Sequence, residues 1–514
     1  MKQKSILTSA ALVAVATVLV RLFGFLRELV LAATYGAGTV SDAFVVAFTV
    51  PDIVLALVAS SAATAFIPTY THMESGENGN LKFTSNVLTI LALIGLIFSG
   101  VFSFVPQALT FLFASNLDEE TFALTTSLLR IMVWAATPVL ITRIFQSYLQ
   151  IQKAFFLAAV MTIPVNVAAI IAIALSKPAG MTAILGYGVL AGSILKLLYM
   201  LLAANRKGYT YRPALNLRMP ELRVFFIMTL PIIFTTLLSE LTQIIDRNFA
   251  SSLVSGSISS LNYAHRTVNL FTTLIGMSVA TVLFPRMSEL SAQGKTDEIR
   301  KHISSCLIKL VPVLLPAMIG VILLADPIVR IMFERGDFTS AATKRTAECL
   351  IMYAGKIIAV SISDILKRAM FSMHDTKTPA IITAVTLAFG ILLKIILIRP
   401  LAHIGLALST SITAILATLL MLSALRKRLG SLKLKTGNWE WVKTLVATIV
   451  MGAVVGLGSL LLPVMSGGTM QTVILTMGLV LVGVGIYTLS HAIMKTMFFR
   501  DMTGVVKSLL SRKS

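Results

Sequence analysis

Charged side chains inside apolar sequence are the residues of this chain whose chemistry needs explaining. The stretch from Val20 to Pro68 reads as two membrane helices joined by a tight turn at residues 35–38. A charge at the bilayer centre costs roughly 2.5–3.5 kcal/mol on insertion scales, so such residues usually face a partner or a watery cavity. The question is what that cavity would hold. The charges in this stretch are Arg21, Arg27, Glu28, Asp42 and Asp52.

Cations are in surplus within the apolar segments of the whole chain. Because arginine carries a planar fork of donors that matches phosphate oxygens, a cationic cavity between helices suits an anionic, phosphate-bearing substrate. The alternative for any one of them is a side chain that snorkels to the interface or forms an ion pair within the bundle. We assign Arg130 and Lys196 to this alternative. The candidate cations are Arg21, Arg27, Arg143, Arg247, Arg266, Lys356 and Lys394.

Two of the acidic residues have simpler explanations that the sequence leaves open. Asp42 follows the glycine-containing turn directly and could cap the second helix. Glu28 could pair with Arg27, although adjacent residues on a helix do not face each other.

Motifs for catalysis are missing from the sequence. It contains no nucleophile elbow, zinc-binding helix or P-loop, and the last absence also argues against an ATP-driven pump. The histidines are scattered, and Cys306 and Cys349 lie far apart, without metal-ligand spacing or a disulfide framework. We therefore predict a protein that is not an enzyme and that needs neither a metal nor another cofactor.

The composition is that of a membrane protein. Of 514 residues, 56% are hydrophobic and 13% are charged. The apolar residues come in blocks of about twenty, the length that crosses a bilayer core as a helix. Helices satisfy their own backbone in lipid, and the alternation of a barrel strand is not seen. The net charge of +21 comes mainly from loops, which indicates contact with lipid headgroups rather than with nucleic acid.

These blocks predict an all-α polytopic membrane protein with about fourteen transmembrane helices. The N-terminus has the lysines and apolar run of a signal peptide, but apolar sequence continues to Ala33, so we expect a retained first helix. The predicted helices cover residues 6–33, 42–67, 87–104, 124–150, 155–175, 184–204, 225–251, 261–285, 306–324, 349–373, 379–398, 405–425, 442–464 and 472–493.

The basic loops predict the orientation. The N-terminus, the loops at 206–223 and 426–443 and the C-terminal tail are all basic, and an even number of helices places all four in the cytoplasm. The loop before residue 349 is an exception on the predicted outside. Either its acidic residues offset its cations or one helix boundary is misplaced. Its cations are Arg330, Arg335, Lys344 and Arg345.

An internal repeat relates the two halves of the chain. The pattern Ala-Thr-x-x-x-Pro occurs at 63–68 and 280–285, and a Gly-Thr-Val-Ser run at 38–41 is echoed by Gly-Ser-Ile-Ser at 256–259. Such repeats are typical of transporters, with the substrate site where the halves meet. We predict four parts: an N-terminal six-helix lobe (1–205), a basic cytoplasmic loop (206–223), a C-terminal six-helix lobe (224–425), and two extra helices with a basic tail (426–514).

Several motifs resemble the MurJ/MviN family of lipid II flippases. One is R-x-x-G-F-x-R-[DE] at 21–28, followed by GAG-x-x-x-DAF at 36–44. Others are FIP at 66–68, YA-x-R at 263–266, LFP at 283–285, FERGDFT from Phe333 and D-x-KTP from Asp375. The resemblance covers nearly the whole chain. The family belongs to a larger superfamily of multidrug, oligosaccharidyl-lipid and polysaccharide exporters, with two six-helix lobes, and its members carry two additional C-terminal helices.

The resemblance implies a function in cell-wall synthesis. Its members move undecaprenyl-pyrophosphate-linked disaccharide-pentapeptide to the outer leaflet of the bacterial cytoplasmic membrane, while the lobes alternate between inward-open and outward-open states. The lipid tail would lie in a groove formed with the two extra helices, and the cell-wall synthesis machinery is the suggested protein partner. The family's essential charges fall on Arg21, Arg27, Asp42 and Arg266, with Glu28 in place of the common Asp. Supporting candidates are Arg143, Arg247, Lys356 and Lys394.

The chain departs from its relatives in two places. Many of them have a further arginine and an acidic residue in the second helix beyond the Pro51 position, where this chain has only Asp52. The resemblance also implies a sodium site in some relatives, built from acidic or amide residues of the seventh and eleventh helices, and in the eleventh helix this chain has Lys394 near that place. A lysine ammonium could replace the ion.

Three other functions compete with a lipid II flippase driven by membrane potential, which contributes about 2.3 kcal/mol per charge per 100 mV. A flippase for another undecaprenyl-pyrophosphate-linked oligosaccharide would have the same fold. A membrane glycosyltransferase or ligase would need a catalytic residue in a sizeable external loop, and the predicted loops are short. A drug or cation antiporter would favour an acidic cavity.

Overall fold

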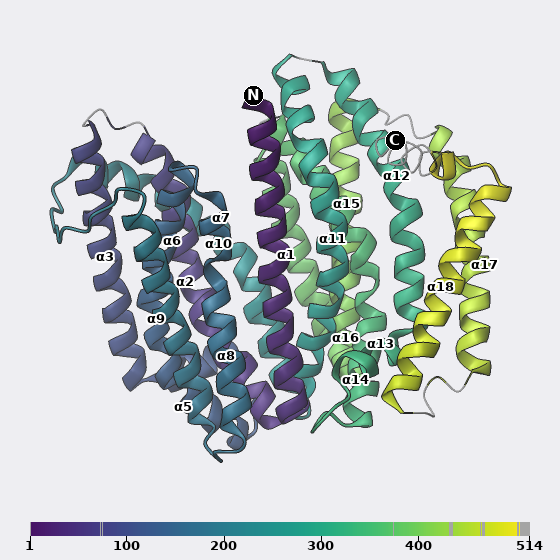
Figure 1. Cartoon of the computed structure of the whole chain (residues 1–514), viewed down its shortest axis with the longest axis horizontal. Helices are drawn as coiled ribbons and strands as arrows, with labels where there is room; N and C mark the ends of the chain where they lie inside the picture. Colours follow the sequence, from purple (N-terminus) through teal and green to yellow (C-terminus); the bar gives the residue numbers. More distant parts are fainter. Residues whose placement is uncertain are drawn as a thin grey trace. The chain divides into compact units, whose positions relative to one another are not determined.

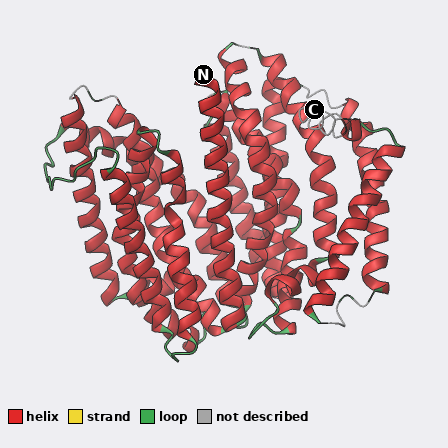
Figure 2. Ribbon diagram, viewed as in Figure 1, coloured by secondary structure: helices red, strands yellow, loops and turns green. Residues whose placement is uncertain are grey.

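The computed structural model describes residues 2–71, 73, 76–293, 295–373, 375–430, 435–462, 464, 468–500 and 503. Throughout these residues the regular structure is helical, without a strand, which confirms the predicted all-α class (Figure 2). The chain forms two compact units. The first contains Met1–Ser259 and Arg335–Thr339, and the second contains Ser260–Glu334 and Ser340–Ser514.

The first unit is built from ten helices and the start of an eleventh, and Figure 1 labels most of them. They are α1 (Lys2–Tyr35), α2 (Thr39–Thr71), α3 (Gly76–Phe104), α4 (Pro106–Phe113), α5 (Glu119–Met132), α6 (Ala136–Ile151), α7 (Phe155–Ala159), α8 (Ile163–Ser176), α9 (Ala183–Asn205), α10 (Pro220–Ser251) and α11 (Ser257–Ala292). Short 3₁₀ turns join α5 to α6 and α7 to α8. α2 packs against α5, α6 and α10, whereas α1 packs mainly against α8.

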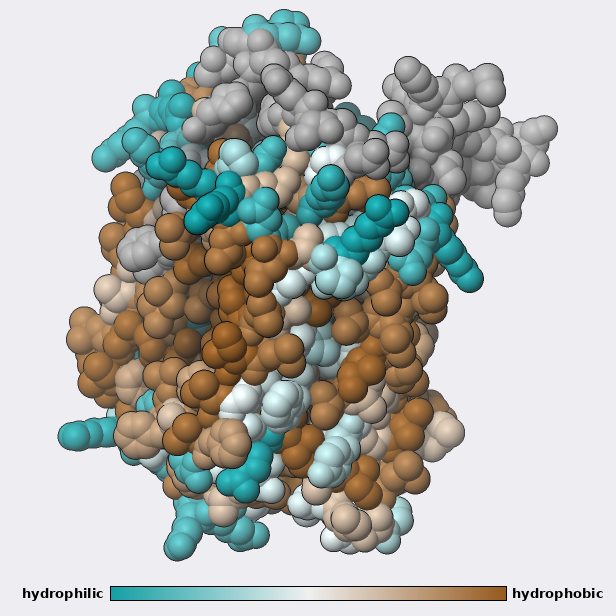
Figure 3. Space-filling model, turned by 90° about the vertical axis from the view of Figure 1, so that its left-hand side faces the viewer, coloured by the Kyte–Doolittle hydropathy of each residue, from teal (hydrophilic) through white to brown (hydrophobic). Residues whose placement is uncertain are grey.

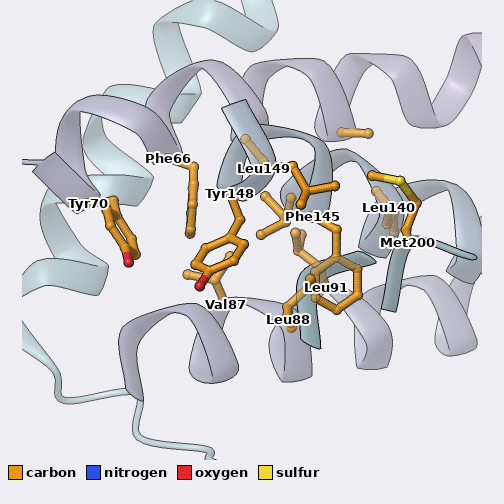
Figure 4. Close-up of a cluster of buried hydrophobic side chains, with 14 of the residues drawn as sticks. Phe66, Tyr70, Val87, Leu88, Leu91, Leu140, Phe145, Tyr148, Leu149 and Met200 are labelled. Atoms are coloured by element: carbon orange, nitrogen blue, oxygen red, sulfur yellow. The ribbon is translucent and has the colours of Figure 1, made fainter. Parts of the chain in front are cut away.

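Aromatic and aliphatic side chains from α2, α3, α6 and α9 form the core of the first unit. Figure 4 shows Phe66 of α2 beside Tyr148 of α6 and Val87 of α3, with Phe145 of α6 farther along the cluster. The ring centroids of Tyr70 and Tyr148 lie 6.1 Å apart at 80°, the edge-to-face arrangement that aromatic quadrupoles favour. This packing fixes the frame against which α1 and α8 are held.

The loop between α9 and α10 is ordered and docked on the first unit. Its Tyr209 is buried, and the hydroxyl lies 3.0 Å from the Ser85 hydroxyl of α3. Asn86, one residue on, exchanges two hydrogen bonds with the backbone of Asn216, at 2.8 and 2.9 Å. The predicted basic loop is therefore a fixed part of this unit rather than a free linker.

Five segments that connect helices lie together at the end of the first unit opposite the α9–α10 loop. The α1–α2 turn contacts the α10–α11 loop through Thr39 and Ser255, and the α4–α5 loop reaches α10 through the bond from the Asn116 N–H to the Ser251 hydroxyl. The 335–339 segment joins them by a bond from the Asp337 N–H to the Ala33 carbonyl, and Lys177 after α8 pairs with Asp337. All five follow odd-numbered predicted helices, as alternating membrane crossings require. Which end faces the cytoplasm stays a prediction.

Apolar surface surrounds the helices as expected for contact with lipid. On the face that Figure 3 shows, hydrophobic residues form a broad belt and hydrophilic residues gather toward the two ends. In the described part of the chain, nine helical segments are long and apolar enough to cross a membrane. Four further helices, α1, α2, α10 and α11, each have at least 32 residues and carry most of the charges singled out above. The predicted total of about fourteen spans remains a prediction.

The second unit contains the remaining part of α11 and seven more helices. They are α12 (Thr296–Leu323), α13 (Ala325–Phe333), α14 (Ser340–Tyr353), α15 (Gly355–Ser372), α16 (Lys377–Leu429), α17 (Lys435–Leu461) and α18 (Thr469–Ile493). The last two pack together and against α12 and α13, and Tyr487 of α18 donates to the Pro312 carbonyl at 2.6 Å. The division by packing falls near residue 259, so the predicted lobe boundaries at 205 and 224 remain predictions.

The helix α16 is two antiparallel arms rather than one long rod. Ala402 has φ 46° and ψ −127°, which breaks the helix. A Cβ on Gly390 would lie 3.0 Å from the Thr413 hydroxyl, whereas residues this far apart on a straight helix are separated by roughly 35 Å. The arms correspond to the two helices predicted at 379–398 and 405–425.

The D-x-KTP run begins the first arm of α16 with a capping carboxylate. Asp375 accepts hydrogen bonds from the N–H and hydroxyl of Thr378, at 3.0 and 2.8 Å, and pairs with Arg428 at 2.7 Å. The bond from the Thr378 N–H is the main cause that lowers the pKa of Asp375 below its ordinary 3.8, although partial burial opposes the shift. The motif therefore has a structural role at the helix start.

We expect Asp375→Ala to lower the stability of the purified protein by about 1 kcal/mol at neutral pH, because a helix cap is lost. A carboxyl with a depressed folded pKa stabilises above its unfolded pKa and loses this effect as the pH falls through the folded value. The difference in stability between the wild type and the variant should therefore become smaller below pH 3.8. Thermal unfolding of both proteins in detergent, at pH values above and below 3.8, measures this difference. A difference that does not change with pH would contradict the capping role of Asp375.

Candidate functional site

Arg27 and Glu28 form a buried ion pair on α1, with 5% and 2% of their surfaces exposed. The Nη2 of Arg27 lies 2.6 Å from the Oε1 of Glu28. Its Nη1 donates to the Oδ1 of Asn166 on α8 at 3.2 Å, and the guanidinium carbon lies 3.9 Å from the ring centroid of Phe48 on α2. One guanidinium is therefore held by a carboxylate, an amide and an aromatic ring from three helices.

The sequence left the pairing of these neighbours open, and in the structure the pair is formed. Adjacent residues on a helix point apart, but the arginine side chain is long enough to turn back to the next carboxylate. The pair is close to neutral, so this part of the site is less cationic than a count of arginines suggests. Replacing such a pair by apolar residues is often neutral for stability, whereas removing one partner costs about 3–5 kcal/mol.

One donor of Arg27 has no acceptor among the described residues. Its Nε is buried and makes no hydrogen bond there. An unsatisfied buried donor costs about 1–3 kcal/mol, and an anionic oxygen is the acceptor that satisfies a guanidinium best. Arg27 can therefore bind an anion through this donor while its other partners hold the guanidinium in place.

Asp42 lies at the start of α2, but it caps another helix. Its two carboxylate oxygens accept the N–H groups of Gly256 and Ser259, each at 2.7 Å, and 2% of its surface is exposed. These N–H groups lie at the start of α11, where a helix leaves donors unpaired and favours a negative charge. The two runs that echo each other in the sequence, at 38–41 and 256–259, are thus joined by one carboxylate next to the first run.

The other candidate cations of the first unit lie in different surroundings. Arg21 is exposed on α1. Arg143 on α6 is half-buried and donates to the amide oxygen of Gln146 at 3.2 Å, and its Nε has no partner among the described residues. Arg247 on α10 is half-buried and donates to the Val45 carbonyl of α2 at 3.1 Å, so it also holds two helices together.

Three of the candidate cations belong to the second unit. Arg266 is exposed on α11. Lys356 on α15 is buried, and its Nζ lies 3.2 Å from the Nε2 of His265 on α11. Because a lysine ammonium only donates, the histidine nitrogen must be the acceptor. Lys394 is buried in the first arm of α16. The predicted meeting of Arg266 with the residues of α1 remains a prediction.

Sequence reasoning missed Asn166, Phe48 and His265. Asn166 is a single amide inside the apolar run of α8, and an amide placed there signals a polar partner in the membrane. Phe48 gave no signal, since an aromatic residue in an apolar helix is usually a packing residue. His265 stands beside Arg266 within the YA-x-R motif, which could have indicated it.

Local pairing explains much of the basic loop on the predicted outside. Arg330 lies in the helix α13 and pairs at 3.3 Å with Glu334, the residue that follows this helix. Lys344 lies in a cavity of about 510 Å³ whose lining includes the carboxylates of Asp326, Glu334 and Glu348. Burial raises the pKa of Asp326, and the nearby Glu348 adds to the shift. These observations favour the first explanation given above, in which acidic residues offset the cations.

Two further expectations from the sequence concern Asp52 and metal binding. The side chain of Asp52, the only charge in the stretch that follows Pro51, lies outside what the structure describes. Among the described residues, no group of three or more His, Cys, Asp or Glu side chains could hold a metal ion, and both cysteines are free.

Known protein families and solved structures are similar to this chain. The family model described as "Lipid II flippase MurJ" matches residues 31–478. A "Probable lipid II flippase MurJ" of Thermotoga maritima is 29% identical over 477 residues, which cover 92% of this chain and 94% of that protein. A solved structure described as "Lipid II flippase MurJ, inward closed conformation" is similar, with a TM-score of 0.82 and 26% identity over 96% of this chain and all of that one. An inward-facing multidrug resistance MATE transporter of the MOP superfamily, with a TM-score of 0.67 and 15% identity over 82% of this chain and 99% of that one, shares the fold alone.

Proposed function

Because the chain belongs to the lipid II flippase MurJ family, and is therefore a multi-pass membrane transporter rather than an enzyme, we propose that it moves lipid II from the inner to the outer leaflet of the cytoplasmic membrane. The movement proceeds by alternating access, with the pyrophosphate of the substrate bound in a central cationic cavity. Two units of packed helices, each with its own core, suit such a cycle.

The buried fork of Arg27 is the observation that supports this proposal most directly. It has one unsatisfied donor and one partner, Glu28, whose place a substrate oxygen can take. Asn166 and Phe48 keep the guanidinium in position during the exchange. In the empty state Glu28 balances the charge, and in the loaded state the pyrophosphate does so.

The remaining candidates take part in different ways. Arg21 and Arg266 are exposed and add positive charge for the second phosphate. Arg143, Arg247, Lys356 and Lys394 support the cavity, and Arg247 does so through the α2 backbone. Asp42 acts on the start of α11 rather than on the substrate, since both of its carboxylate oxygens are occupied by backbone N–H groups.

The experiment that tests the proposal is replacement of a native flippase. In a bacterium depleted of its own lipid II flippase, expression of this chain should restore growth and the appearance of lipid II in the outer leaflet. A chain that restores neither, but moves another undecaprenyl-pyrophosphate-linked oligosaccharide in vesicles, would show that the shared pyrophosphate is read and that the headgroup differs. The single charge after Pro51 is the feature of the sequence that favours this second substrate.

We expect transport to be independent of sodium. Lys394 is buried near the place where some relatives are expected to hold the ion, and an ammonium group supplies a fixed positive charge there. Flipping by proteoliposomes should therefore be unchanged when choline replaces sodium at constant membrane potential. Strict dependence of transport on sodium would contradict this role of Lys394.

A further inference from the structure

The segment Arg335–Thr339, which we call the strap, packs with a unit other than that of its neighbours in the chain. Glu334 before it and Ser340 after it belong to the second unit, whereas the strap itself belongs to the first. It makes up the last five residues of the FERGDFT run, whose purpose the sequence left unexplained.

The strap is held on the last turn of α1 by its backbone. The Asp337 N–H donates to the Ala33 carbonyl at 3.0 Å, one of the carbonyls that a helix end leaves without an internal partner. The Asp337 carboxylate pairs with Lys177, and both side chains are about half exposed, at 48% and 47%. An ion pair so exposed contributes little to stability. The strap is held instead by its backbone and by the side chain of Phe338, which is buried.

Glycine is required on both sides of this contact. Gly336 has a φ of 59°, and a Cβ there would lie 2.0 Å from the Ala33 carbonyl oxygen. Gly36, in the turn after α1, has a φ of 63°, and its Cβ would lie 2.5 Å from the Asp337 carbonyl oxygen. The backbone of the strap and the backbone at the end of α1 therefore approach so closely that only glycine fits at Gly336 and Gly36. Gly180 differs, because it has a similar φ of 64° but no atom within 4 Å of the position of its Cβ.

We propose that the strap is a releasable latch on the end of α1, the helix that carries Arg27. Both ends of the strap continue directly into helices of the second unit, α13 and α14, so a movement of that unit would strain the contact between the strap and α1. A backbone hydrogen bond, an ion pair on the surface and the buried side chain of Phe338 are among the contacts that hold it. All of them are noncovalent, as in segments that pack and release during conformational cycles. The role of the latch rests on the proposed transport function, but its presence does not.

Cross-linking of the latch tests the proposal. Lys177→Cys and Asp337→Cys are combined in a chain that lacks the native thiols, with Cys306→Ala and Cys349→Ala, and a short bismaleimide joins the two exposed positions. We expect the cross-linked protein to bind the lipid substrate normally and to flip it at least about tenfold more slowly, because a conformational step is blocked. Each single cysteine, treated with the same reagent, should keep its transport rate.

The outcomes separate the latch from the function itself. Full transport by the cross-linked protein would overturn the latch, and so would failure of the reagent to join the two positions. If the untreated protein moves no lipid II, the proposed function fails, whereas cross-linking alone still reports the strap on α1. Gly336→Ala gives a second test without a reagent. It should displace the strap and reduce transport, while Gly180→Ala, with the same backbone strain and no crowding, should not.

Discussion

Arg27→Ala is expected to abolish flipping of lipid II while the protein still inserts into the membrane. The guanidinium is the buried donor group of α1, and each charge-assisted hydrogen bond that it makes is worth about 1.5–3 kcal/mol. Loss of two such bonds to the pyrophosphate would weaken binding by a factor on the order of 10²–10⁴. The measurements are growth of cells that depend on the variant and the lipid II content of the outer leaflet.

Arg27→Ala also lowers the stability of the fold, and this effect must be separated from the loss of substrate binding. It leaves Glu28 buried without its partner, 2.6 Å from where the Nη2 had been, and such a change costs about 3–5 kcal/mol of stability. Combining Arg27→Met with Glu28→Gln removes both charges at similar volume and should restore the fold but not transport. Arg27→Lys keeps the charge and loses the fork, so it should also transport poorly.

Arg130→Ala provides the matched control for these variants. Arg130 is exposed on α5, so its removal should leave transport unchanged. The same loss of transport as for Arg27→Ala is expected of Arg266→Ala, and Arg266 is exposed on α11. Normal growth of cells that rely on Arg27→Ala or on Arg266→Ala alone would refute the proposed site.

The sequence predicted the helices well because the bilayer imposes one length and one polarity on them. The turn at Ala402 is an example, since the apolar blocks at 379–398 and 405–425 each have the length of one crossing. The same blocks indicated the all-α class. The bond partners inside the site were less predictable, because the sequence shows which residues are charged but not which way a long side chain turns. The Arg27–Glu28 pair illustrates this limit.

The role of Asp42 could not be read from its neighbours in the chain. A carboxylate one turn after a glycine usually caps the helix that it begins, and that was the simple alternative. Its partners, Gly256 and Ser259, lie more than two hundred positions away. The signal that could have found them was the repeat itself, since the 256–259 run echoes the residues beside Asp42. The strap was hidden for a similar reason, because only the packing of α1 shows why Gly336 is needed.

Asp42→Ala is expected to stop transport while leaving the binding of the lipid substrate intact. The change removes the acceptor of two buried N–H groups at the start of α11. At about 1.5–3 kcal/mol for each charge-assisted bond, the loss is a large part of the 5–15 kcal/mol that typically stabilises a folded domain. Asp42→Asn keeps one acceptor oxygen and should fall between the wild type and the alanine variant.

Comparison with a second capping carboxylate decides whether Asp42 acts on the helix or on the substrate. Asp118 caps α5 through the N–H and hydroxyl of Thr121, at 2.9 and 2.7 Å, and Asp118→Ala should cost only about 1 kcal/mol and leave transport unchanged. A carboxylate that touched the pyrophosphate would repel it, so its removal would tighten binding. If Asp42→Ala alters substrate affinity and leaves thermal stability as it was, Asp42 contacts the substrate. Lower stability with unchanged affinity and no transport means instead that the start of α11 must be held for the transport cycle to proceed.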